Sequence, residues 1–124
     1  MIALSLLLVT VAVLLGAAAA IWHIRDPARG AKPPALLAAT HGALASAGVI
    51  LLIFALGETP DASASGVAGF DDGAVVLFAI AILAGLAIPA LRRWRGGVPG
   101  VLVALHAGIA VTGYVIFLAW AFLR

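Results

Sequence analysis

Residues 34–56 read PALLAATHGALASAGVILLIFAL and contain no charged side chain. A transmembrane helix needs roughly 20 consecutive apolar residues, so this stretch is long enough to cross a bilayer. It lies within an uncharged segment at 33–57, and three more uncharged segments lie at 1–24, 73–91 and 96–123. The sequence therefore predicts four membrane-spanning helices.

The composition of the whole chain agrees with this prediction. Of the 124 residues, 65% are hydrophobic and 10% are charged, whereas a soluble domain is about 45–50% apolar and about 25% charged. Four spans leave no room for a nucleotide-binding, soluble catalytic or nucleic-acid-binding domain. The net charge is only +2, which does not suggest nucleic acid as a partner. The absence of cysteine excludes disulfides, thiolate metal sites and iron–sulfur clusters.

We predict one all-α domain over residues 1–124, an integral membrane up-down-up-down bundle with helices over about 2–24, 34–57, 73–94 and 98–123. Small residues at the end of the first segment resemble a signal-peptide cleavage region. No positive charge precedes that segment, so we expect it to be retained as a helix.

The charges of the connecting segments predict the orientation. Segments 25–32 and 92–95 are basic, whereas segment 58–72 carries four acidic residues and no basic one. By the positive-inside rule, the basic segments are cytoplasmic, and both termini and segment 58–72 are periplasmic or extracellular, with Arg124 as an exception. Segment 58–72 is predicted to be an exposed connector, or else a docking surface for a basic partner. Abundant Ala, Gly and Arg favour a bacterium, and hence its inner membrane.

Residues 99–121 align with residues 34–56 without a gap, at an offset of 65. The end of the first predicted helix, LLGAAAAIWHIR, is also loosely similar to LAGLAIPALRRWR at the end of the third. A duplicated helical hairpin explains both similarities, with its halves related by an axis along the membrane normal. The identical pairs at the offset of 65 are Pro34/Pro99, Leu37/Leu102, Ala39/Ala104, His41/His106, Ala45/Ala110 and Gly48/Gly113.

The repeat places His41 and His106 at one depth, because each follows its proline by seven residues. With a rise of 1.5 Å per residue, both lie roughly 10 Å from the cytoplasmic end. If the helices are arranged sequentially, the two spans stand on a diagonal of roughly 11–14 Å. Nitrogen–metal bonds of about 2 Å would let an ion bridge the two imidazoles, whereas a direct hydrogen bond between them is disfavoured.

Small residues follow each histidine at helical spacing, Ala45 and Gly48 on one span and Ala110 and Gly113 on the other. Positions four and seven residues apart share a helix face. We therefore expect these four residues to leave a flat slot that accepts the edge of a porphyrin. The alternative is that they allow the helices to approach closely.

An imidazole in the hydrocarbon region needs a partner, which makes it a functional candidate. Structural zinc prefers four ligands, and the chain has three His, no Cys and no acid inside a span. A haem iron needs only two axial ligands from the protein. We predict one haem b with His41 and His106 as its axial ligands. The bases that could neutralise its propionates are Arg25, Arg29, Lys32, Arg92, Arg93 and Arg95.

The third histidine, His23, lies at the end of the first predicted helix. We expect it to be solvated at the interface, or else to contact a quinone headgroup or a haem propionate.

With THGALASAG and LHAGIAVTG around these histidines, the chain resembles the small four-helix membrane b-type cytochromes, including the bacterial cytochrome b561-like proteins. The resemblance implies haem between histidines of different helices and electron transfer between quinone or another carrier and a partner protein. The only residue roles that the resemblance implies for this chain are those of His41 and His106 as the two haem ligands. Familiar b561-type proteins often hold two haems with four histidines, whereas this chain can hold one by that scheme.

The function predicted is therefore electron transfer in the bilayer with quinone or a redox subunit, in a homo- or hetero-oligomer, without necessarily any catalytic activity of its own. One alternative is a non-haem accessory or assembly subunit, whose histidines bond to Ser or Thr. Another is a small transporter, which needs a wet path lined by the histidines and by Ser5, Thr10, Thr40, Ser46 and Thr112.

Overall fold

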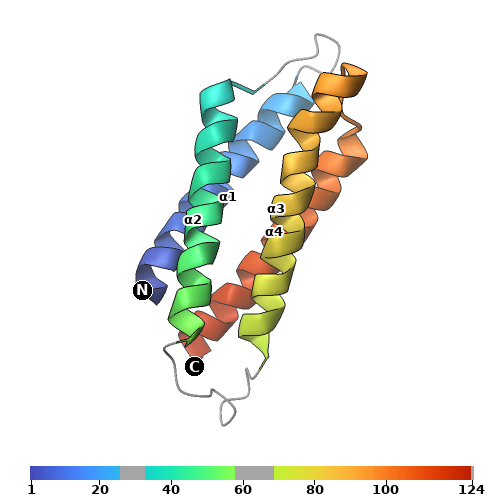
Figure 1. Cartoon of the computed structure of the whole chain (residues 1–124). Helices are drawn as coiled ribbons and strands as arrows, with labels where there is room; N and C mark the ends of the chain where they lie inside the picture. The colour runs from blue at the N-terminus through green and yellow to red at the C-terminus, as the bar shows by residue number, and fades with distance from the viewer. Residues whose placement is uncertain (26–32, 58–68, 124) are drawn as a thin grey trace.

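The computed structural model in Figure 1 describes residues 1–25, 33–57 and 69–123. Each of its four helices is long and apolar enough to cross a membrane. The predicted all-α four-helix bundle is thereby confirmed, and the chain is a multi-pass membrane protein. The helices are α1 (Ile2–Arg25), α2 (Ala35–Gly57), α3 (Phe70–Arg95) and α4 (Gly100–Leu123).

The helices form two hairpins that lie side by side (Figure 1). Helix α1 packs chiefly against α2, and α3 packs chiefly against α4, while α1–α4 and α2–α3 contacts join the hairpins. Within the part of the chain that the structure describes, α2 and α4 make no close backbone contact. They therefore stand on a diagonal of the bundle, and the two chain termini lie at one end of it.

Helix α3 begins at Phe70, three residues before its predicted start at 73, and Asp71 and Asp72 occupy its first turn. The prediction that both belong to the connecting segment was wrong. Acidic side chains are stabilised in a first turn by the positive end of the helix dipole, so the charge that suggested a loop also suits a helix start. The remaining acids of that segment, Glu58 and Asp61, lie outside the described residues, as do 26–32 and Arg124.

A left-handed glycine ends α3. Gly96 has a φ of 74°, and its N–H donates to the carbonyl oxygen of Arg92 at 3.0 Å. A residue without a Cβ adopts this conformation without strain. The chain can therefore reverse within a few residues, and α4 begins after Pro99.

Burial is confined to the half of the bundle nearer the chain termini. No residue of 13–25, 35–47, 82–95 or 100–112 is buried. Each helix must turn some residues inward, so the inner faces of that second half are not sealed by their neighbours. We call the two parts the packed half and the loose half. The buried residues fall within 5–12 of α1, 48–55 of α2, 74–81 of α3 and 113–120 of α4.

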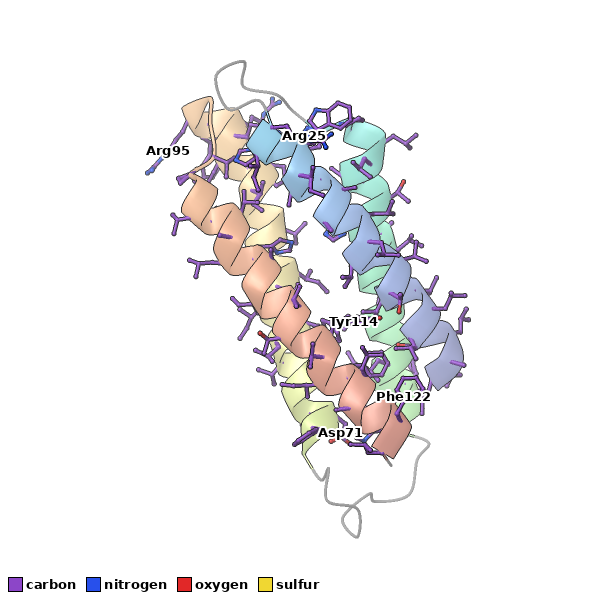
Figure 2. The ribbon with its side chains drawn as sticks, turned by 180° about the vertical axis from the view of Figure 1, so that it is seen from behind. Arg25, Asp71, Arg95, Tyr114 and Phe122 are labelled. Atoms are coloured by element: carbon purple, nitrogen blue, oxygen red, sulfur yellow. The ribbon has the colours of Figure 1, made fainter. Side chains whose placement is uncertain are left out.

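In the packed half, an apolar cluster lies beside polar contacts between helices. Ser5 donates a hydrogen bond to the carbonyl oxygen of Gly48 at 2.7 Å. The hydroxyls of Thr10 and Tyr114 lie 2.9 Å apart and join the two hairpins; Tyr114 is labelled in Figure 2. Thr10 gives its own hydrogen to the carbonyl of Leu6, so Tyr114 is the donor to Thr10. The cluster comprises Val9, Val49, Leu52, Ala74, Phe78, Phe117 and Trp120.

Helices α1 and α2 pack closely at Gly48, and a substitution of this residue tests that contact. A Cβ at this residue would lie 2.7 Å from Val9 Cγ2 and 3.1 Å from the backbone nitrogen of Val9. We expect Gly48→Ala to force the helices apart and to lower the free energy of unfolding by about 1–3 kcal/mol. Thermal unfolding followed by circular dichroism in detergent measures this change.

Gly42→Ala on the same helix is the matched control, since a Cβ there meets nothing within 4 Å. Equal melting temperatures for the two variants would contradict the assignment of Gly48 to a tight helix contact.

Candidate functional site

His41 of α2 and His106 of α4 meet across the diagonal of the bundle. Their ring centroids are 6.0 Å apart, and the ring planes are perpendicular at 90°. Both side chains are half-buried. Each precedes the nearest buried residue of its helix, Gly48 or Gly113, by about two turns. The pair predicted from equal depth therefore lies at the boundary between the packed and loose halves.

Each histidine forms a hydrogen bond with a backbone carbonyl of its own hairpin. His41 Nδ1 lies 2.8 Å from the carbonyl oxygen of Ala12, and His106 Nδ1 lies 2.9 Å from that of Ala81. A carbonyl oxygen only accepts hydrogen bonds, so in each neutral imidazole the hydrogen is on Nδ1. The Nε2 atom then carries a lone pair.

The Nε2 atoms are the chemically available groups of the site. Among the residues that the structure describes, no hydrogen-bond donor contacts either one. A histidine that ligates a metal usually donates its other ring N–H to a carbonyl or carboxylate, which fixes the tautomer and increases the basicity of the ligand. Both imidazoles have the hydrogen bond from Nδ1 to a carbonyl oxygen.

Two glycines make room for the imidazoles. The carbonyls of Ala12 and Ala81 also accept the helical N–H of the residue four positions later, which is Gly16 or Gly85. A Cβ on Gly16 would lie 2.8 Å from His41 Cε1, and a Cβ on Gly85 would lie 3.0 Å from His106 Cε1. Each imidazole thus rests directly over a glycine.

The residues of α1 and α3 at this site were not predicted from the sequence; they are Ala12, Gly16, Ala81 and Gly85. Their signal is the similarity of LLG at 14–16 to LAG at 83–85, which has an offset of 69 rather than 65. The offset is 65 between α2 and α4 but 69 between α1 and α3. The difference of four residues arises because His41 follows Ala12 by 29 residues, whereas His106 follows Ala81 by 25. Aligning each helix separately would have found the repeated alanine and glycine.

Gly48 and Gly113 have a different neighbourhood from the one predicted. The space at Gly48 is taken by Val9, and a Cβ on Gly113 would lie 3.1 Å from Leu77 Cβ and 3.3 Å from Phe78 Cδ1. These two glycines therefore allow the close approach of α1 to α2 and of α3 to α4, which is the alternative given for them, and their contact with a cofactor stays a prediction. Ala45 and Ala110 are half-buried, and their contact with a cofactor stays a prediction.

The basic side chains lie at the end of the loose half. Figure 2 places Arg25 and Arg95 at one end of the bundle and Asp71 and Phe122 at the other. Arg92 is half-buried, while Arg25, Arg93 and Arg95 are exposed. His23 is half-buried near the end of α1, and none of the described residues forms a hydrogen bond with it.

The hydroxyl groups considered for a transport path do not form a continuous line. Ser5 and Thr10 are engaged in the packed half, and Thr112 is exposed and donates to the carbonyl of Gly108 at 2.8 Å. Thr40 is exposed and Ser46 is half-buried. This distribution gives no support to a wet path through the bundle.

Comparison of the chain with protein-family models, with curated proteins and with solved structures gave no match.

The donor set is compatible with one metal held by two imidazoles. Within the described ranges, no group of three or more metal-ligating side chains forms, and the two imidazoles of His41 and His106 are the ring nitrogens brought together at this site. Two nitrogen–metal bonds of about 2.0–2.1 Å, with about 1.1 Å from each nitrogen to its ring centre, allow the centroids to be at most about 6.3 Å apart. The observed 6.0 Å is close to this value, and it also lies in the range of about 4.5–7 Å for edge-to-face ring contact.

The tautomer is the first testable feature of the site. We expect ¹⁵N NMR of histidine-labelled protein without cofactor, at about pH 9 where imidazole is neutral, to show Nδ1 protonated and Nε2 unprotonated for His41 and His106. Variants at each position assign the signals. Protonation at Nε2 of either residue would contradict the hydrogen bonds to Ala12 and Ala81.

Proposed function

We propose that the protein is a membrane b-type cytochrome that binds one haem b through His41 and His106 and carries electrons within the bilayer. The observation that carries this proposal is the facing pair of imidazoles, each with Nδ1 committed to a carbonyl and Nε2 available, at a centroid distance of 6.0 Å. Two axial nitrogens are what a porphyrin-bound iron requires from a protein.

The loose half also supports the proposal, because it offers space for a macrocycle and basic side chains for its carboxylates. A macrocycle held by the two histidines needs space beside them, and the residues between the histidines and the basic end include none that is buried. The two carboxylates of haem b need neutralising groups or water. Arg25, Arg92, Arg93 and Arg95 stand at the end of that half and are suited to pair with carboxylates.

A bound haem supplies a reversible one-electron carrier. The chain's own residues would determine how it works. If His41 and His106 both held the haem iron, the group would supply electron transfer rather than chemistry on a substrate. The carbonyls of Ala12 and Ala81 hold the imidazoles in the ligating tautomer. The packed half, with Phe78 and Phe117 in its apolar cluster, lies on one side of the site.

The proposal also includes a location and a partner. The four spans are apolar and suited to contact with lipid-soluble carriers and other membrane helices, so we propose quinone or another redox subunit as the partner. We propose the bacterial inner membrane, with the basic end cytoplasmic and the termini on the opposite side. The haem would then lie in the cytoplasmic leaflet. This assignment agrees with the resemblance to the small b-type cytochromes.

The visible spectrum tests the cofactor. We expect haem-replete protein purified in detergent to give a sharp low-spin b-type α band in the dithionite-reduced minus air-oxidised spectrum. His41→Ala and His106→Ala should each abolish that low-spin band, because each removes an axial ligand. His23→Ala is the matched control and should retain it.

A correctly folded protein without a haem band would overturn the proposal. The direct ring contact between the histidines would then favour a packing role in an accessory subunit. Retention of the low-spin band in His41→Ala or His106→Ala would exclude bis-histidine ligation by this pair.

The absence of native cysteine allows a clean test of orientation. We expect a membrane-impermeant maleimide to label Ser63→Cys in intact cells, but to label Gly97→Cys only after the membrane is opened, because the basic connection is cytoplasmic. Gel-shift labelling measures both. The reverse pattern would refute the orientation without affecting the haem assignment.

A further inference from the structure

We infer that Gly16 and Gly85 are positioning residues that hold His41 and His106 in the ligating tautomer and thereby set their strength as ligands. The effects on haem rest on the proposed function. The effect on the tautomer rests only on the hydrogen-bond geometry, so the two can be tested separately.

The nearest neighbours of a side chain added at either glycine are atoms of a histidine ring. For Gly16, the three atoms nearest to an added Cβ are His41 Cε1 at 2.8 Å, Nδ1 at 3.1 Å and Nε2 at 3.5 Å. For Gly85 they are the same three atoms of His106, at 3.0, 3.4 and 3.8 Å. A Cβ would therefore press on the ring itself, between its two nitrogens.

Helix packing does not account for these two glycines. Gly48 and Gly113 are buried in the packed half, and an added Cβ there meets Val9 or the side chains of Leu77 and Phe78. Gly16 and Gly85 lie in the loose half and are not buried. The small residue is needed there because an imidazole from the next helix passes over it.

The position of each glycine is tied to the carbonyl that its histidine uses. The glycine N–H and the imidazole N–H share one acceptor, because a helical N–H bonds to the carbonyl four residues earlier. The imidazole must approach that carbonyl beside the glycine's own Cα. The same arrangement occurs at Ala12–Gly16 and at Ala81–Gly85. In both hairpins the histidine is therefore positioned by a carbonyl and by the glycine four residues later.

Adding a methyl group should therefore weaken the hydrogen bond rather than the fold. We expect Gly16→Ala to shift His41 away from Ala12, and Gly85→Ala to shift His106 away from Ala81. The effect should be larger at Gly16, where the contact is closer. Loss of such a supporting hydrogen bond typically weakens metal affinity by about 10- to 100-fold. A less basic imidazole also stabilises ferric iron less, so the reduction potential should rise.

The experiment compares these variants with Gly42→Ala and Gly108→Ala, whose added Cβ meets nothing within 4 Å. On protein without cofactor, ¹⁵N NMR should show that Gly16→Ala lowers the Nδ1-protonated fraction of His41 and leaves His106 unchanged, with the reverse for Gly85→Ala. On haem-loaded protein, titration should show weaker binding, and potentiometry should show a higher potential. Neither control should change these readouts.

The outcomes separate the two proposals. Unchanged tautomers and an unchanged potential in both glycine variants would overturn the positioning role, even if the protein binds haem. The expected tautomer changes in a protein that binds no haem would support the positioning role and refute the cytochrome. A fall in melting temperature like that of Gly48→Ala, with the tautomer unchanged, would assign Gly16 and Gly85 to packing and also overturn the inference.

Discussion

The hydrogen bond from a histidine to a backbone carbonyl of the neighbouring helix is the constraint on which the centre of this bundle depends. It occurs once in each hairpin, from His41 to Ala12 and from His106 to Ala81. An imidazole in an apolar interior has few partners, and here the carbonyl satisfies one ring nitrogen and leaves a lone pair on the other. These contacts join α1 to α2 and α3 to α4 at the level of the histidines.

The sequence alone was sufficient for the fold. Uncharged segments of spanning length predict the helices, because the cost of burying a charge in lipid allows little else. It was also sufficient to single out His41 and His106, since their offset placed them at one depth. It was less informative at Asp71 and Asp72, whose charge suits both a connection and a helix start.

The neighbours of the histidines were harder to predict. Gly48 and Gly113 share a helix with a histidine, and helical spacing therefore suggested that they lie beside it. The residues that do touch the rings, Gly16 and Gly85, are on the other helix of each hairpin. Predicting which residue of α1 or α3 touches the ring requires the register between the two helices of each hairpin. The histidine follows its carbonyl partner by 29 residues in one hairpin and by 25 in the other. An alignment at a single offset therefore does not match the equivalent residues of α1 and α3.

The separation of the packed half from the loose half has an evolutionary consequence. In the packed half, side chains such as Leu52 and Phe117 are enclosed, so a substitution must respect the volume of several neighbours at once. In the loose half, no residue of the four described ranges is enclosed in this way, so a substitution meets fewer protein neighbours, and selection there acts mainly on a few groups with specific chemistry. Related sequences should therefore diverge faster around 13–25 and 82–95 than around the core, except at the histidines, their glycines and the arginines at the basic end.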